Sequence, residues 1–352
     1  MERNELKKNV LSAEQYLRIM EQNAWNLNRY AFDFEDMVDP SNRQETLRDQ
    51  IVAMALEGDF VASAPGAGLN LHQNLRQFAN SLRDDIAQIL PATLQNTWLD
   101  SVIGILPLGA VNGCVLKRLP NNVLDKYLIV LNYGLTFGCQ AIADGLTIEI
   151  LQGEMEAYRG DGSSSFLNAV TFLFEPSKPN LDRLLAPRDF PDEVEAEFAT
   201  HAGALCSIML KFVALHELGH IVNGDCENAN GVNQLSMAQE AKSHVQYTRP
   251  ESAAHESWPA ELAADRFALE YLCDWKSDAS TCWPNVAQIY LFFSWLEHCE
   301  KRKGALLCQY HPSASVRKQQ IVDAAHGLAK NHPAEDFFSQ IDDLIDRWTS
   351  AV

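Results

Sequence analysis

The feature that most constrains this chain is a long run of apolar residues at helical spacing that ends in two histidines. Between Pro191 and Gly224 the apolar residues recur every three or four positions, which predicts one helix from Asp192 to about Asn223. Asp192 can cap the start of this helix, and Gly224 can end it. We therefore expect a long, largely buried helix with the two histidines near its C-terminal end.

These histidines belong to the sequence HELGH, in which Glu217 follows His216 and precedes His220. Residues four apart on an α-helix lie one above the other, so both imidazoles project from one face. A zinc ion accepts two imidazole nitrogens at about 2.0–2.1 Å, which leaves the glutamate free to reach a metal-bound water. The pattern predicts a metal site; the alternative is a helix whose two histidines make only structural contacts.

The third ligand separates the classes of zinc enzyme that use this motif. In metzincins a glycine and a third histidine follow, but Asn223 and Cys226 occupy those two positions here, so that class is excluded. A glutamate on a later helix is the other solution, and Glu261 opens the helical segment ELAADRFAL. Asp265 lies on the same helical face and can accept the second ring N–H of a ligating histidine.

Two alternatives to this third ligand stay open. Glu261 and Asp265 can form a solvated acidic face, or another side chain can serve as the ligand. The competing residues are His255, Glu256 and Glu270. Three protein ligands would leave a fourth position for water, which is typical of a catalytic rather than a structural zinc site.

A third segment, HPSASVRKQQI, begins with His311 and Pro312 and carries Arg317. A proline at this place predicts a helix start. Taken alone, the segment is a helix start that carries a basic residue.

The three motifs HELGH, ELAAD and HPSASVR, in this order, resemble those of the gluzincin metallopeptidases, closest to the HtpX and CAAX-prenyl-endopeptidase type. The chain also resembles a soluble relative of the phage-exclusion peptidase Lit. The resemblance implies that one zinc ion is bound by three residues and that a general base lies beside it. It assigns the zinc ligands to His216, His220 and Glu261, the general base to Glu217, support of a ligand to Asp265, and contact with the substrate or developing oxyanion to His311 and Arg317.

The implied function is a zinc-dependent endopeptidase that hydrolyses peptide bonds of an intracellular protein by zinc-activated water. Two alternatives remain: a latent defence or toxin-type protease that needs a trigger or activating partner, and a non-catalytic, zinc-stabilised regulatory binding module. The expected partner is a protein or peptide substrate.

Charge and hydropathy restrict the other partners. The chain has 47 acidic and 28 basic residues and a net charge of −19, which argues against nucleic-acid binding. The apolar segment 101–116 is shorter than a spanning helix and contains Pro107 and Asn112, so we expect it to be buried and expect no membrane span. The N-terminal residues do not resemble a secretory signal, and the eight cysteines form no CxxC pair. We therefore expect free thiols and a cytoplasmic protein.

The expected fold class is α+β and mainly α-helical, with a zincin-like core and a small β-sheet beside the zinc helix. Residues 126–134 predict a strand, and an edge of its sheet at Tyr127–Asn132 is expected to add a strand of substrate. Residues 1–120 are expected to form an N-terminal helical region of unassigned role, and residues 121–352 a metallopeptidase domain. Further helices are predicted at 70–90, 260–272, 285–301, 314–329 and 337–348, with a proline-rich connection at 175–191.

Overall fold

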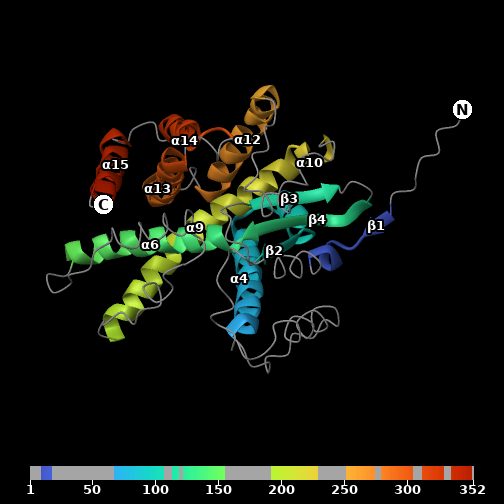
Figure 1. Cartoon of the computed structure of the whole chain (residues 1–352), viewed down its shortest axis with the longest axis horizontal. Helices are drawn as coiled ribbons and strands as arrows, with labels where there is room; N and C mark the ends of the chain where they lie inside the picture. The colour runs from blue at the N-terminus through green and yellow to red at the C-terminus, as the bar shows by residue number, and fades with distance from the viewer. Residues whose placement is uncertain are drawn as a thin grey trace, which may run out of the picture. The chain divides into compact units, whose positions relative to one another are not determined.

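The structure is a computed structural model of the 352-residue chain, and its helices and strands are shown in Figure 1. Most described residues are helical and one small sheet accompanies them, which confirms the expected α+β, mainly helical class. The structure describes residues 9–17, 67–106, 113–118, 122–154, 192–228, 251–273, 279–303, 311–328 and 334–350. The predicted connection at 175–191 lies outside these residues.

The elements follow the chain in an order that alternates a small sheet with long helices. They are β1 (Asn9–Leu11), α4 (Ala67–Ile89), α5 (Ala92–Leu99), β2 (Val102–Leu106), β3 (Gly113–Arg118), β4 (Asn122–Asn132), α6 (Tyr133–Glu154), α9 (Asp192–Val222), α10 (Asp225–Asn228), α12 (Glu251–Leu272), α13 (Ala279–Lys303), α14 (Ala314–Leu328) and α15 (Ala334–Ser350).

The chain divides into two compact units. The first, here the sheet unit, comprises Met1–Tyr133 and His220–Tyr247; the second, here the helical unit, comprises Gly134–Gly219 and Thr248–Val352. Residues of α9 up to Gly219 belong to the helical unit, and its last three residues, from His220 to Val222, belong to the sheet unit. The domain boundary expected at residue 120 stays a prediction.

Strand β4 is the centre of the sheet in the sheet unit. Strands β1 and β2 run parallel to β4 and pair with its first and last residues, whereas β3 runs antiparallel along β4 (Figure 1). Residues 128–131 of β4 pair with β2 on one side and with β3 on the other, so both edges of β4 are occupied there. The strand predicted at 126–134 is confirmed, but Tyr127–Asn132 cannot itself accept a strand of substrate, so that expectation is wrong.

Residues 101–106 and 113–116 of the segment 101–116 are buried or half-buried, as expected, and form two strands that were not predicted, whereas residues 107–112 lie outside the described residues. Ile105 and Leu106 of β2 and Leu116 of β3 are buried, and Leu106 and Leu116 pack with Leu128 of β4. Strand β4 is apolar on both faces, which is typical of a central strand, and β2 and β3 from this segment pair with its two edges. The seven cysteines within the described part of the chain are free thiols, as expected.

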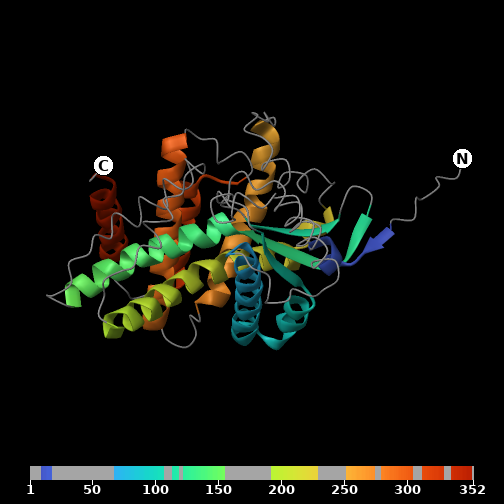
Figure 2. The ribbon, with the colours of Figure 1, turned by 60° about the horizontal axis from the view of Figure 1, so that its bottom comes forward.

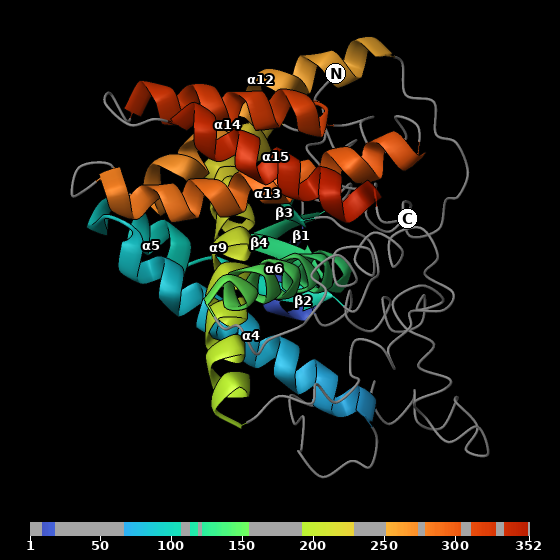
Figure 3. The same ribbon diagram turned by 90° about the vertical axis from the view of Figure 1, so that its left-hand side faces the viewer.

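The helical unit is built around α13, whose middle is buried on nearly all sides. Helix α13 packs against α12, α14 and α15, which lie close together in Figure 3. Helices α6 and α9 run alongside each other (Figure 2), with Ile148 and Leu151 of α6 packed on Phe198 and Ala202 of α9. Phe212 of α9 meets Phe293 of α13 edge to face, with ring centroids 5.6 Å apart. The hydrophobic residues of α9 therefore form part of the core of the helical unit.

Helix α9 is also the one described helix that is long and apolar enough, by length and composition, to cross a membrane. The qualifying part is Ala196–Val222, with a mean hydropathy of 1.6. Buried core helices pass the same test, and half of its most apolar window is buried inside the protein.

The predicted helices are confirmed, but α12, α13 and α15 begin nine, six and three residues before their predicted starts. Helix α12 begins at Glu251, whereas the sequence analysis extended a polar loop as far as Pro259. Proline removes one backbone hydrogen bond from a helix, which is why a break was expected there. In the structure the helix nevertheless continues through Pro259, which is exposed.

The contact of α6 with α13 leads to a prediction about stability. A Cβ atom on Gly138 of α6 would clash with the ring of Trp295, including a 2.7 Å approach to Cζ2, and Trp295 is fully buried. We expect Gly138→Ala to lower the free energy of unfolding by roughly 1–3 kcal/mol, the usual cost of overpacking. Chemical denaturation measures this change.

Gly203 supplies the matched control, because it lies inside α9, is exposed and has no atoms within 4 Å of the added Cβ. Gly203→Ala should raise the free energy of unfolding by about 0.5–1 kcal/mol through helix propensity. Equal effects of the two substitutions would show that Trp295 does not pack on Gly138.

Candidate metal centre

Helices α9 and α12 approach closely at the point where their two motifs meet. A Cβ atom on Gly219 would lie 3.0 Å from Cα of Ala264 and 3.3 Å from its Cβ. Ala264 and Ala268 are fully buried, whereas Ala263 is exposed. The glycine between the two histidines and the small residues after Glu261 therefore let the two helix backbones come into contact.

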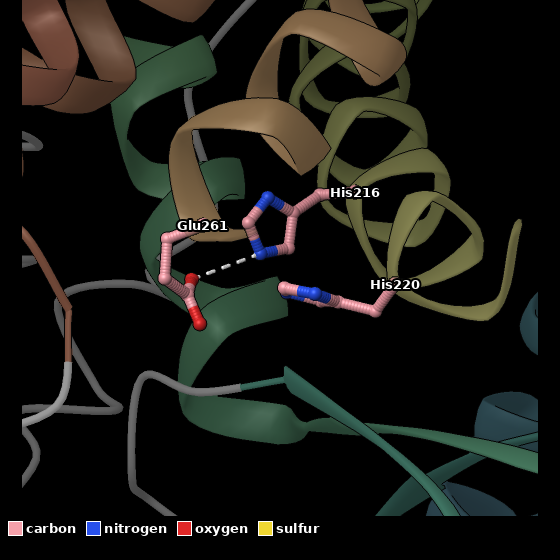
Figure 4. A group of neighbouring side chains, drawn as sticks. All are labelled: His216, His220 and Glu261. Atoms are coloured by element: carbon pink, nitrogen blue, oxygen red, sulfur yellow. Dashed lines mark ion pairs between the residues drawn. The ribbon is translucent and has the colours of Figure 1, made fainter. Parts of the chain in front are cut away.

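This approach brings the three predicted zinc ligands together (Figure 4). One donor atom from each of His216, His220 and Glu261 lies within 4.8 Å of the others. The Nε2 atom of His216 is 3.3 Å from Oε2 of Glu261. Two ligand atoms at ordinary zinc bond lengths and a tetrahedral angle lie about 3.3–3.4 Å apart, so this pair fits a shared metal ion.

The other nitrogen of His216 faces a buried carboxylate. Nδ1 of His216 lies 2.8 Å from Oδ1 of Asp265, which has no exposed surface. Burial acts to raise the pKa of Asp265, but the charge and hydrogen bonds of Arg317 and the bond to His216 outweigh it and hold that pKa below its usual value. An ionised carboxylate only accepts hydrogen bonds, so Nδ1 carries the proton and Nε2 keeps a lone pair for a metal.

Arg317 lies behind this carboxylate, on the Nδ1 side of His216. Its Nε donates to Oδ2 of Asp265 at 2.7 Å, and its Nη2 donates to Oδ1. Its guanidinium also stacks on Phe293, with Cζ 4.7 Å from the ring centroid. Burial acts to lower the pKa of Arg317, but Asp265, followed by Glu261 and Glu217, raises it, so the group stays charged. Two of its donors are therefore committed to Asp265.

His311 contacts the proposed third ligand. Its Nδ1 lies 2.7 Å from Oε2 of Glu261, the same oxygen that approaches His216. The side chain of His311 is 38% exposed, against 12% for that of Glu261. His311 therefore lies where the buried ligand carboxylate meets the surface.

The structure also shows a partner that the sequence analysis missed. Nδ1 of His220 lies 2.9 Å from Oδ2 of Asp225, five residues further along the chain. Between them Gly224 ends α9 in the left-handed region, with φ of 75°, and its N–H donates to the carbonyl of Ile221 at 3.1 Å. The sequence feature that could have indicated this contact is Asp225 itself, because it directly follows Gly224, the glycine at which the helix ends and the chain reverses.

Glu217 is buried next to His216, with 5% of its surface exposed. No described residue donates a hydrogen bond to its carboxylate or forms an ion pair with it. Of the competing ligands, Glu270 is exposed, and the side chains of His255 and Glu256 lie outside the described part of the structure.

No curated protein and no solved structure matches the chain. A family model, Peptidase U49, matches residues 162–337, half of the 352 residues. The matched range contains all three motifs, HELGH, ELAAD and HPSASVR, and every residue of the candidate metal centre, and by this match the chain belongs to the Peptidase U49 family.

Proposed function

We propose that this peptidase is a zinc-dependent endopeptidase with a zincin-like core, which cleaves an intracellular protein in the cytoplasm. The observation that carries the proposal is the convergence of donor atoms from His216, His220 and Glu261 within 4.8 Å. Membership of a peptidase family supports proteolysis as the reaction. The location and the intracellular substrate rest on the sequence alone.

The donor set suits zinc in number and kind. Two imidazole nitrogens and one carboxylate oxygen are a common ligand set for catalytic zinc, whereas structural sites usually have four protein ligands. When bound, Zn²⁺ would act as a Lewis acid that polarises the peptide carbonyl and lowers the pKa of water. The three ligands therefore favour a catalytic enzyme over a zinc-stabilised binding module.

Glu217 is the proposed general base. Its carboxylate lies beside the ligands and makes no hydrogen bond with a described residue, so it is available to accept a proton. In peptide hydrolysis it would take the proton of the attacking water and pass it to the nitrogen of the leaving amine.

His311 and Arg317 take different proposed roles. In its imidazolium form His311 can donate Nδ1–H to Glu261 and Nε2–H to the substrate oxygen that becomes negatively charged. Arg317 is a positioning residue, because its Nε and Nη2 bind Asp265, which in turn orients His216. The contacts therefore favour an indirect role for Arg317 over direct contact with the oxyanion.

The first prediction of this proposal concerns the general base. Glu217→Gln should lower turnover by about 100- to 10,000-fold, because the amide cannot accept the proton, while zinc stays bound. The measurement compares wild type and variant in lysate of the cells that make the protein, with new protein N-termini mapped by mass spectrometry.

Zinc content of both proteins is measured in parallel. Glu270→Gln is the matched control, because Glu270 lies exposed on α12, and it should cut at the wild-type rate. Loss of zinc from Glu217→Gln would contradict the assigned role, since it would make Glu217 part of the metal site.

A second prediction concerns the third ligand. Glu261→Gln removes the charged oxygen that lies 3.3 Å from His216, and we expect zinc affinity to fall by more than about 100-fold, beyond the loss typical of residues behind a ligand. Competition with a chelator measures this affinity. An unchanged affinity would exclude Glu261 as a ligand and would favour an acidic face without metal.

A third prediction concerns the buried ion pair. Arg317→Met leaves the Asp265 carboxylate buried without its cation, and we expect the free energy of unfolding to fall by about 3–5 kcal/mol. The double variant Asp265→Leu/Arg317→Met removes both charges and should recover most of this loss. Recovery in denaturant unfolding identifies the unpaired charge as the cause, whereas additive losses would contradict it.

A further inference from the structure

The two histidines of HELGH are each held by a carboxylate, but the two carboxylates differ. Nδ1 of His216 faces Asp265 at 2.8 Å, and Nδ1 of His220 faces Asp225 at 2.9 Å. The side chain of Asp265 has no exposed surface, whereas that of Asp225 is 34% exposed. In both cases the bond at Nδ1 leaves Nε2 as the atom for a metal.

The two contacts also differ in charge. Arg317 binds both oxygens of Asp265 and neutralises it. Among the described residues no lysine or arginine pairs with Asp225, in contrast to Asp265. A carboxylate on the far nitrogen of an imidazole raises the basicity of the ligating nitrogen, and an unbalanced carboxylate does so most strongly.

We infer that Asp225 is a positioning residue that sets the strength of metal binding through His220. The inference rests on the metal site of the proposed function. Arg317 neutralises Asp265, so among the carboxylates that contact the two histidines of HELGH, Asp225 is one whose charge is available to a divalent cation, as is that of the ligand Glu261. Asp225 acts through the imidazole of His220, whose Nδ1 lies 2.9 Å from its Oδ2.

The backbone places Asp225 at this position. Gly224 adopts φ of 75°, which reverses the chain directly after α9, and Asp225 is the first residue of α10. Helix α10 packs against β3, within the sheet unit. A Cβ atom added to Gly224 would have no atoms within 4 Å, so the backbone conformation, and not crowding, restricts the residue type there.

The main test compares zinc affinity in Asp225→Asn and in Asp343→Asn, measured on the full chain by competition with a chelator. Asparagine keeps the shape of the side chain and removes its charge, and Asp343 is an exposed residue of α15 that loses the same charge. We expect Asp225→Asn to bind zinc about 10- to 100-fold more weakly, and Asp343→Asn to bind it like wild type.

Two further readouts separate positioning from a purely structural role. The metal-free forms of Asp225→Asn and wild type should unfold at similar temperatures, while the rise in melting temperature on adding zinc should be smaller in the variant. The visible absorption spectrum of the Co²⁺-loaded protein should also change, because the imidazole ligand becomes less basic. A metal-free variant that melts far below wild type with an unchanged spectrum would contradict the inference.

A second pair of variants tests the same inference without touching Asp225. Alanine disfavours positive φ, so Gly224→Ala should displace Asp225 and weaken zinc binding by a similar factor. Asparagine tolerates positive φ, so Gly224→Asn should bind zinc nearly as wild type does. This pair decides the question if Asp225→Asn does not fold.

The outcomes distinguish the inference from the function on which it rests. A wild-type chain that binds no stoichiometric zinc overturns the proposed function itself. Zinc bound tightly by wild type and equally tightly by Asp225→Asn and Gly224→Ala overturns only the role of Asp225. Weaker binding in those two variants, with both control variants unchanged, supports the inference.

Discussion

The candidate metal centre depends on a largely buried charge pair. Asp265 has no exposed surface and Arg317 donates to both of its oxygens, so each charge is stable there only because the other is present. This pair joins α12 to α14, and the bond from Asp265 to His216 extends the connection to α9. One ion pair thus links the three motifs HELGH, ELAAD and HPSASVR, which explains why they contribute residues to a single site.

Close packing makes this pair possible. Gly219 allows Ala264 of α12 to touch the backbone of α9, and Phe293 of α13 covers the guanidinium of Arg317. With larger residues at these positions the helices would stand further apart, and neither Glu261 nor Asp265 would reach His216. Gly219 and Ala264 have no functional groups, but they set the distance between α9 and α12 and so determine whether the metal site can form.

Much of this arrangement was predictable from local patterns. The period of apolar residues gave the bounds of α9 within one residue, and the spacing of His216 and His220 gave their common face. Asp265 was expected behind a histidine because it lies one helical turn after Glu261. These predictions succeed because a helix has fixed geometry, so residue spacing alone determines which side chains share a face.

What the sequence did not reveal depends on tertiary contacts. The partner of Arg317 is set by how α14 packs against α12, and no spacing within HPSASVR encodes it. Strands β2 and β3 were missed because their apolar residues identify burial and not pairing. Asp225 was missed for a related reason: its contact with His220 follows from one backbone conformation at Gly224, which a helix-stop signal suggests but does not specify. Two histidines that look equivalent in the sequence therefore differ in the folded chain: His216 is oriented by a buried, neutralised carboxylate and His220 by a partly exposed, charged one.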